Sequence, residues 1–412
     1  MKILVLAPGT LGDVAPAAGL AQALVADGHA VTVVADAEHA ALVKSSASTH
    51  APIHASMSPT EPGVDAPEGD GPGVRAYLRS LRLYMRAAAE AAMFASPGAE
   101  VVLTNAISPY GHDIAEAIGA RSADALLQPA RPSAAYPPMI ASGRNLGPRG
   151  NRLAGAAAAR VPAPVDPACA WVRQELGLPP RSRLAGQRQR NRAASPVHHG
   201  ISSVVLPRPD DWPDELSLDG FWWPPAQTDW RPPADLADFL RAGPAPVLVS
   251  LGSIPLGSGP AAELAKGLHL GTGRVLLQGD QMRPVAERLG PDRALHIGVT
   301  PHDWLFTRVA AVVHQAGAGV AAAALRAGVP SVPVPVHTDQ PFWARRLEAI
   351  GAATSPVPAK RLTAAALDAN IREATGSDAL RTGALTVSSQ LAQEDGTLPI
   401  RHWIQTLAGH TA

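Results

Sequence analysis

A glycine-rich turn after an apolar run is the first feature of the sequence with chemical potential. Residues 309–314 are mostly apolar and end in His314, and the turn Gln-Ala-Gly-Ala-Gly follows and opens a helical pattern. N–H groups at a helix start bind anions, and glycines let a ligand approach closely. One phosphate could therefore be bound by His314 and by the N–H groups of Ala318, Gly319 and Val320. The alternative is a tight turn with a structural histidine.

A polar pair follows the next apolar run. Asp339 and Gln340 come shortly after residues 331–336. A carboxylate accepts hydrogen bonds and an amide both donates and accepts them, so this pair is suited to sugar hydroxyls. Asp339 also precedes a helical stretch, so the alternative role is a helix cap.

Two further polar residues lie at predicted strand ends. Asp13 follows the apolar run 2–8 through a short turn with two glycines. It could act as a general base toward an acceptor hydroxyl, or cap the helix that starts near Val14. Ser253, after the run 246–251, could hydrogen-bond a diphosphate or simply belong to a turn. The first turn lacks the pattern G-x-G-x-x-G, so a dinucleotide site is not indicated.

Alternating strand and helix patterns must position these residues. Apolar runs separated by helical stretches predict parallel sheets with right-handed crossovers, and ligands of such sheets bind at the carboxyl ends of the strands. The fold class expected is α/β, with two doubly wound parallel-sheet lobes facing each other across a cleft. The predicted strands are 2–8, 31–35, 100–105, 125–128, 246–251, 274–278, 294–297, 309–314 and 331–336.

Proline and tryptophan divide the chain. Residues 207–244 carry eight prolines and four tryptophans, which is typical of an interdomain linker. We expect a first lobe over 1–206, this linker, a second lobe over 245–395 and a C-terminal helix over 396–412. A Pro-, Gly- and acid-rich stretch over 56–73 predicts a long functional loop.

Composition excludes several classes of protein. The 412 residues include 35 basic and 35 acidic side chains, so the net charge is zero and a non-specific nucleic-acid binder is not expected. Cys169 is the one cysteine, which excludes a disulfide framework and a cysteine-based zinc site. No apolar run reaches 18 residues. We expect a soluble cytoplasmic protein, without membrane insertion, that is a monomer or a homodimer.

Several segments together resemble one family, the family 1 glycosyltransferases of the GT-B fold. The resemblance is greatest to the bacterial branch that includes the vancomycin-type antibiotic glycosyltransferases and the sterol glucosyltransferases. Near the N-terminus, residues 9–14 resemble the family's G-x-x-G-D motif. The other similar segments are 128–129, 136–138, 220–222, 299–306, 309–319, 327–330 and 338–344.

The resemblance implies an inverting, metal-independent transfer of a hexose or deoxyhexose. The donor would be a UDP- or dTDP-linked sugar, with no further cofactor, and the acceptor a hydroxyl of a natural-product aglycone. Asp13 would be the catalytic base, with Thr10 and Gly12 on the acceptor side. The second lobe would bind the donor, its diphosphate through His314, Ala318, Gly319, Val320 and Ser253, its sugar through Asp339 and Gln340, and its base through Val299.

Two departures from the family pattern leave alternatives open. The family segment H-H-G-G-A-G-T here has Gln315 in place of the second histidine and Val320 in place of the threonine. One hydroxyl donor to the diphosphate is therefore missing. Weaker or altered donor use is one consequence, and a non-catalytic accessory protein of the same fold is another. A sterol or lipid glucosyltransferase is the alternative within the enzyme class.

Overall fold

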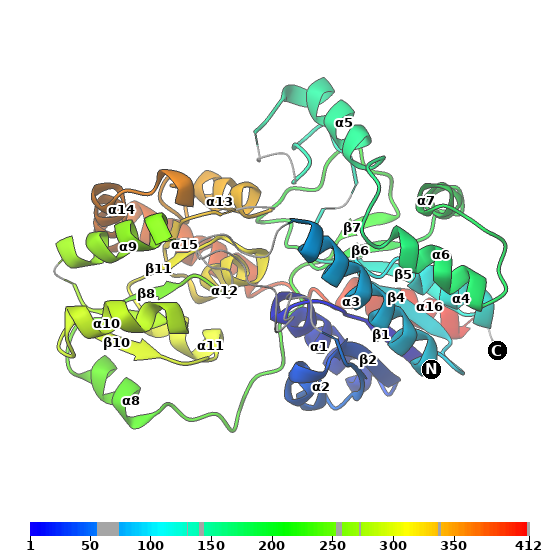
Figure 1. The fold of residues 1–412 in the computed structure, drawn as a ribbon, viewed down its shortest axis with the longest axis horizontal. Coiled ribbons are helices and arrows are strands. Elements are labelled where there is room, and N and C mark those ends of the chain that lie inside the picture. Colours follow the sequence, from blue (N-terminus) through cyan, green and yellow to red (C-terminus); the bar gives the residue numbers. More distant parts are fainter. Residues whose placement is uncertain are drawn as a thin grey trace.

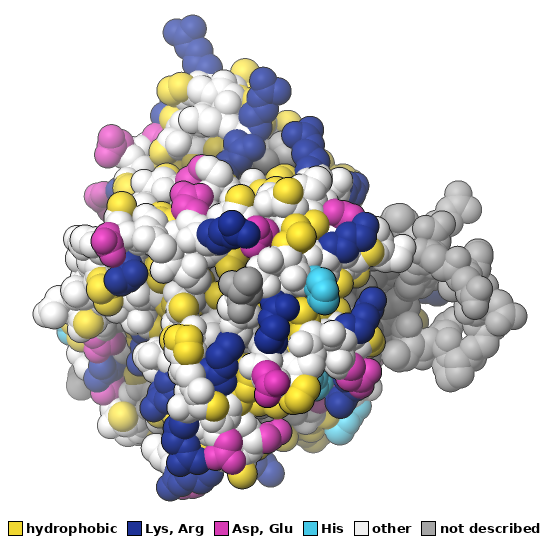
Figure 2. Space-filling model, turned by 90° about the vertical axis from the view of Figure 1, so that its left-hand side faces the viewer, with side chains coloured by type: hydrophobic (Ala, Val, Ile, Leu, Met, Phe, Trp, Pro, Cys, Tyr) yellow, Lys and Arg dark blue, Asp and Glu magenta, His cyan; other side chains and the backbone are white. Residues whose placement is uncertain are grey.

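The structure is a computed structural model that describes residues 1–55, 74–129, 131–139, 144–252, 258–271, 273–336 and 339–409. Two α/β lobes lie side by side, and each has one parallel sheet with helices on both faces (Figure 1). Among the helices within these ranges, none combines the length and the apolar character needed to cross a bilayer. On the end of the molecule formed by the second lobe, basic and acidic side chains are interspersed (Figure 2).

The first lobe is built on a seven-stranded parallel sheet in the order β3-β2-β1-β4-β5-β6-β7. Strands β1 and β4 lie at its centre, and their apolar side chains are buried from both sides, as expected for parallel strands covered on both faces. The strands are β1 (Lys2–Leu6), β2 (Ala30–Asp36), β3 (Thr49–Ile53), β4 (Val101–Thr104), β5 (Arg121–Leu126), β6 (Val197–His199) and β7 (Leu216–Leu218).

Helices cover both faces of this sheet. The helices of this lobe are α1 (Leu11–Ala26), α2 (Ala40–Ser45), α3 (Val74–Ala95), α4 (Gly111–Ile118), α5 (Gly147–Ala158), α6 (Asp166–Glu175) and α7 (Arg183–Arg192). One core joins α1 to the sheet and a second joins α3, α4 and α6 to its other face.

The second lobe has a five-stranded parallel sheet in the order β10-β9-β8-β11-β12. Its strands are β8 (Val247–Ser250), β9 (Val275–Gln278), β10 (Ala294–Ile297), β11 (Ala311–His314) and β12 (Ser331–Pro333). Its helices are α8 (Ala234–Arg241), α9 (Ser258–Leu270), α10 (Arg283–Leu289), α11 (His302–Leu305), α12 (Ala318–Ala327), α13 (Gln340–Ala349), α14 (Ala364–Gly376) and α15 (Asp378–Leu391).

The last helix, α16 (Leu398–Gly409), packs against the first lobe. Ile400 and Ile404 are fully buried in the core that α1 shares with the first sheet. The Arg401 guanidinium donates two hydrogen bonds to the Asp27 carboxylate, at 2.6 and 2.5 Å. The chain thus ends on the lobe in which it began (Figure 1).

The predicted secondary structure agrees with most of the observed elements and differs at identifiable places. All nine predicted strands are present, although β5 begins at Arg121, four residues earlier than expected, because its first residues are polar. The edge strands β3 and β7 and the three-residue strand β6 beside β7 have no long apolar run and were not predicted. The four-residue helix α11 has Pro301 at its N-cap.

The stretch predicted as a linker, 207–244, contributes to both lobes. Its β7 pairs with β6 in the first sheet, and its α8 buries Leu236 and Phe239 in the core of the second lobe. The lobes also share a core, in which side chains of β5, β6 and the following segment contact α13 and α15. The lobes are therefore joined by buried apolar contacts as well as by the connecting chain.

Candidate functional site

Asp13 lies in the first turn of α1, directly after β1. Thr10 is the N-cap of this helix, and its N–H and hydroxyl both donate to Asp13 Oδ2, at 3.0 and 3.2 Å. Asp13 is thus the third helical residue of a capping box rather than the N-cap. Gly9 has φ +132°, and a Cβ atom there would lie 2.4 Å from Asp13 Oδ2, so this position requires glycine.

A buried network of hydrogen bonds fixes Pro8 and Gly9, in the loop that precedes Asp13. The Gly9 N–H donates to Tyr84 Oη at 2.6 Å, and the Tyr84 hydroxyl donates to the Asp36 carboxylate. On the other side, Asn105 Nδ2 donates to the Pro8 carbonyl at 3.1 Å. These residues were not predicted from the sequence, because nothing in a helix rich in arginine and alanine marks one tyrosine as a support for a distant loop.

The surroundings of Asp13 disfavour its charge. Burial raises the pKa of Asp13 to about 6, the negative charges of Asp339 and Asp36 contribute to this rise, and the hydrogen bonds from Thr10 oppose it. A carboxyl with a pKa near neutrality can release and accept a proton under physiological conditions. The effect of Asp339 also means that two candidate site residues from opposite lobes lie within electrostatic reach of each other.

His314 ends β11 and is fully buried. Its Nδ1 accepts a hydrogen bond from the Ala316 N–H at 3.0 Å, which leaves the ring proton on Nε2. Within the described part of the chain, Nε2 has no hydrogen-bond partner. Burial lowers the pKa of His314 to about 3, with a smaller contribution from His302. The ring is therefore neutral and can offer one N–H donor, but no positive charge.

The N-terminus of α12 lies three residues beyond His314. Its N-cap is Gly317, which has no side chain with which to cap the helix. The N–H groups of Ala318, Gly319 and Val320 belong to the first turn, where an α-helix has no internal acceptors for them. Gly319 is exposed and its two neighbours are half-buried. Together with the helix dipole, these groups form a site suited to an anion.

Asp339 and Gln340, which are adjacent in sequence, have different surroundings. Asp339 is at the N-cap of α13 but its side chain makes no cap hydrogen bond. Its Oδ2 instead accepts from Gln128 Nε2 at 2.8 Å and from Trp343 Nε1 at 3.1 Å. Gln340 is buried, and its Oε1 accepts from the Val336 N–H at 2.8 Å.

Gln315 connects the two predicted turns of the second lobe. Its Oε1 accepts from Gln340 Nε2 at 3.3 Å, so the residue that replaces the family's second histidine bonds the predicted sugar-binding glutamine. Gln340 thus ties the segment after β12 to the turn after β11. Asp339, by contrast, faces the first lobe.

The remaining predicted site residues lie as follows. Val299 is 90% exposed after β10, and Thr10 and Gly12 are exposed at the start of α1. Ser253 lies outside the described residues, as does the predicted loop 56–73. Within the described ranges, no group of three or more His, Cys, Asp or Glu side chains is arranged to hold a metal ion.

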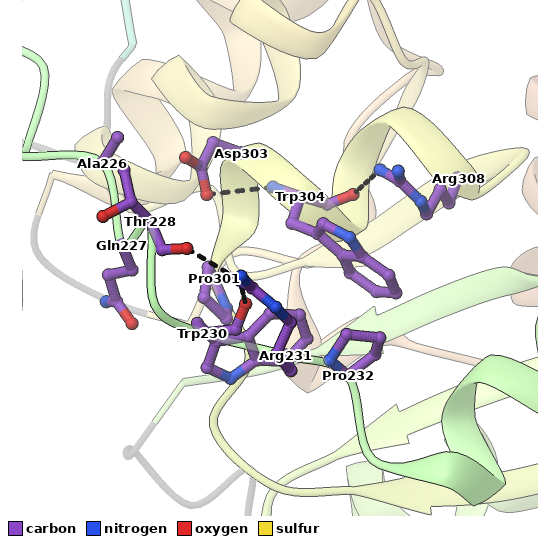
Figure 3. A pocket seen from close by; sticks show the side chains of 10 residues that line it. All are labelled: Ala226, Gln227, Thr228, Trp230, Arg231, Pro232, Pro301, Asp303, Trp304 and Arg308. Carbon is purple, nitrogen blue, oxygen red and sulfur yellow. Dashed lines mark hydrogen bonds between the residues drawn. The ribbon is translucent and has the colours of Figure 1, made fainter.

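A pocket of about 440 Å³ lies between the chain connecting the lobes and α11 (Figure 3). The indole rings of Trp230 and Trp304 lie 4.9 Å apart, and the Arg308 guanidinium lies over the Trp304 ring at 4.3 Å. The residues that line the pocket are Ala226, Gln227, Thr228, Trp230, Arg231, Pro232, Pro301, Asp303, Trp304 and Arg308. None of them is a predicted site residue.

The two facing parallel-sheet lobes define the GT-B fold, and solved structures agree with this assignment. The glycotransferase of kitacinnamycin has a TM-score of 0.69 and 20% identity over 98% of both chains. The glycosyltransferase VinC, solved in complex with dTDP, has a TM-score of 0.63 and 18% identity, covering 98% of this chain and 99% of that one. The fold predicted from the sequence is therefore confirmed.

Sequence comparisons specify the resemblance further. Residues 274–401 match the family described as erythromycin biosynthesis protein CIII-like, C-terminal domain. O-mycaminosyltylonolide 6-deoxyallosyltransferase of Streptomyces fradiae is 37% identical over 254 residues, which are 57% of this chain and 58% of that protein. Sterol 3-beta-glucosyltransferase of Penicillium rubens is 28% identical over 417 residues, covering 96% of this chain and 30% of that protein.

This chain therefore matches 58% and 30% of the length of these two curated relatives, which is less than two thirds of each. The relatives and the structural neighbours are named as glycosyltransferases of antibiotic and sterol type, so the resemblance predicted from the motifs is confirmed.

Proposed function

We propose that this protein is an inverting, metal-independent glycosyltransferase that moves a hexose or deoxyhexose from a nucleotide sugar to a hydroxyl of a natural-product aglycone. The observation that carries this proposal is that Asp13 of the first lobe and Asp339 of the second, which Gln128 of the first lobe hydrogen-bonds, lie within electrostatic reach of each other. The two lobes thus direct toward one region a carboxyl with a pKa near neutrality and a carboxylate suited to sugar hydroxyls. A proton acceptor beside a sugar-binding group is the arrangement that glycosyl transfer to an alcohol requires.

In the proposed mechanism, Asp13 accepts the proton of the acceptor hydroxyl. The oxygen then attacks the anomeric carbon from the face opposite the diphosphate, and the bond from that carbon to the diphosphate breaks. Thr10 and Gly9 keep the Asp13 carboxylate in place through the capping box and the close approach at the turn. The configuration at the anomeric carbon is inverted.

The second lobe would stabilise the departing diphosphate. The N–H groups of Ala318, Gly319 and Val320 point in the direction of the positive end of the α12 dipole, and His314 Nε2–H adds one neutral donor. Donors fixed before the reaction stabilise developing negative charge without reorganisation. We further propose that Asp339 binds the sugar, that Val299 contacts the base and that Ser253 adds a donor to the diphosphate.

The donor nucleotide that we propose to test first is dTDP, because VinC was solved with dTDP bound. Calorimetric titration of the purified protein with dTDP and with UDP would measure this, with His314→Ala as the control. We expect saturable binding of one nucleotide and weaker binding in the variant. Binding of neither nucleotide would contradict the proposal and favour an accessory protein of the same fold.

A sterol acceptor is the second candidate, because relatives such as that of Penicillium rubens are named sterol 3-beta-glucosyltransferases. Incubation with the nucleotide sugar and either a macrolide aglycone or a sterol in detergent would separate the two candidates. We expect a glycosylated product from the aglycone. A product from the sterol alone would favour the second candidate.

A further inference from the structure

One side chain of the first lobe bonds two residues of the second through both ends of its amide. Gln128 follows β5, and its Nε2 donates to Asp339 Oδ2 at 2.8 Å. Its Oε1 accepts from Trp343 Nε1 at 3.0 Å. Since Trp343 Nε1 also lies 3.1 Å from Asp339 Oδ2, the three polar groups form a closed triangle.

The chemistry of the partners determines how this amide is oriented. An indole N–H only donates and a carboxylate only accepts, so the oxygen of Gln128 must face Trp343 and its nitrogen must face Asp339. Trp343 is 2% exposed and packs in the core shared by the lobes, so the direction of its N–H is fixed. Gln128 and Asp339 are only half-buried. The triangle is therefore buried at Trp343 and accessible at Gln128 and Asp339.

This triangle determines how Asp339 is presented. The carboxylate lies within electrostatic reach of Asp13, whose charge would repel it. Two N–H donors on Oδ2 oppose that repulsion and fix the carboxylate from two directions. One of these donors belongs to the same helix as Asp339, but the other is supplied by the opposite lobe. The orientation of Asp339 therefore depends on the lobes being together.

We propose that Gln128 is a positioning residue for the donor sugar, which orients Asp339 across the lobe junction and so couples lobe approach to sugar recognition. This inference rests on the proposed function, in which Asp339 binds the sugar. Gln128 acts through Asp339, so it affects the binding of a nucleotide sugar and leaves the binding of the free nucleotide unchanged.

The experiment compares dTDP with dTDP-glucose, and UDP with UDP-glucose, as calorimetric ligands of the full chain. The variants are Gln128→Ala and Gln128→Glu, the latter with the same shape but with a carboxylate facing Asp339. We expect both to bind the free nucleotide as the parent does, and the nucleotide sugar at least ~10-fold more weakly, since a hydrogen bond to a charged group is lost. For Gln128→Glu, the loss of affinity for the nucleotide sugar should become smaller as the pH falls. The introduced carboxyl group, once protonated, can donate a hydrogen bond to Asp339 again.

A matched control breaks another bond between the lobes. The Arg346 guanidinium donates from Nε and Nη2 to the Val205 carbonyl of the first lobe, at 3.0 and 2.7 Å. Arg346→Met keeps most of the aliphatic side chain and removes these bonds. We expect it to bind both the nucleotide and the nucleotide sugar as the parent does.

The outcomes are distinguishable. Equal binding of the nucleotide sugar by the parent and both Gln128 variants overturns the positioning role and leaves the proposed function standing. If Arg346→Met weakens binding of the nucleotide sugar as much as the Gln128 variants do, the positioning role is also overturned. The effect would then come from any weakened contact between the lobes. A parent that binds no nucleotide overturns the proposed function and this role together. If Gln128→Ala fails to fold, the isosteric Gln128→Glu and its pH dependence decide.

Discussion

Asp13 combines a structural and a proposed chemical role in one carboxyl group. Its Oδ2 accepts from the N–H and the hydroxyl of Thr10, and it lies against a glycine that leaves room for it. The hydrogen bonds favour the charged form, whereas burial and the nearby carboxylates favour the neutral one, and the latter effects prevail. The capping role and the role as a base can therefore coexist, but a substitution must separate them.

Asp13→Asn separates these two roles. The amide oxygen of asparagine can still accept from the Thr10 N–H, but it cannot accept a proton from a hydroxyl at neutral pH. We expect turnover of the nucleotide sugar and acceptor to fall at least ~100-fold, while nucleotide binding stays near that of the parent and the melting temperature is not lowered. Steady-state rates, calorimetry and thermal unfolding measure the three quantities. Undiminished turnover would remove Asp13 as the base.

The pH dependence of catalysis should follow the ionisation of Asp13. Since only the carboxylate can accept a proton, kcat/KM should rise with pH through about 6 and level off above it. A profile that is flat between pH 5 and 7 would contradict this expectation.

Stability should have the opposite dependence. The pKa of Asp13 is raised from about 3.8 to about 6 on folding, so the folded state holds a proton that the unfolded state has lost. The stability that protonation of Asp13 contributes is therefore full below about pH 4 and is lost as the pH rises through about 6. Asparagine does not titrate, so Asp13→Asn should remove this pH dependence of stability. Denaturant unfolding of the parent and the variant at several pH values would measure the difference.

At the scale of one element, the turn between β11 and α12 carries most of the hydrogen-bond donors that we propose for the diphosphate. It positions a neutral N–H of His314 next to the open N-terminus of a helix, and these groups come from neighbouring residues. Val320, however, stands where the resemblance implies a threonine hydroxyl. Backbone donors remain, since they do not depend on the side chain.

Val320→Thr should therefore improve donor binding. A restored hydroxyl adds one hydrogen bond of about 0.5–1.5 kcal/mol to the diphosphate, so we expect about two- to tenfold tighter binding of the preferred nucleotide. Calorimetric titration measures this gain, and Val320→Ala, which adds no hydroxyl, is the control. Equal affinities for Val320→Thr and the parent would argue against a diphosphate at the start of α12.

At the scale of the whole molecule, the two lobes share one hydrophobic core. Phe342 of α13 is 3% exposed, packs edge to face against Tyr136 of the first lobe at 5.7 Å, and belongs to a cluster with residues from both lobes. The same helix carries Asp339 at its N-cap and Trp343 in its second turn. The proposed sugar site is therefore attached to the junction rather than to a freely moving second lobe.

Phe342→Ala should weaken both lobes together. Truncation of a buried phenylalanine costs about 3–5 kcal/mol, and here the cavity opens between the lobes. Hydrogen exchange should accelerate in β1 and β4 as well as in β8 and β11. As a control, Phe239→Ala removes a ring from a core that lies within the second lobe alone. Unchanged exchange in β1 and β4 in the Phe342 variant would mean that the lobes unfold independently.

The amino-acid pattern was sufficient for the features that arise from neighbouring residues. Apolar runs and helical periodicity predict the parallel strands, and the turns after β1 and β11 bring Asp13 and His314 to strand ends, because the geometry of a strand–turn–helix unit is local. The position of Asp339 after β12 follows in the same way. These elements account for the two lobes and for most of the candidate site.

Folding in three dimensions was needed for contacts between residues far apart in the chain. Gln128 meets Asp339 across 211 positions, and Tyr84 supports Gly9 across 75. No periodicity links such residues, since their proximity depends on how whole sheets and helices pack. The same holds for β7, a three-residue strand that becomes part of the first sheet only by pairing with β6. Local patterns determine the residue types at the candidate site, whereas long-range packing determines how those residues are oriented toward one another.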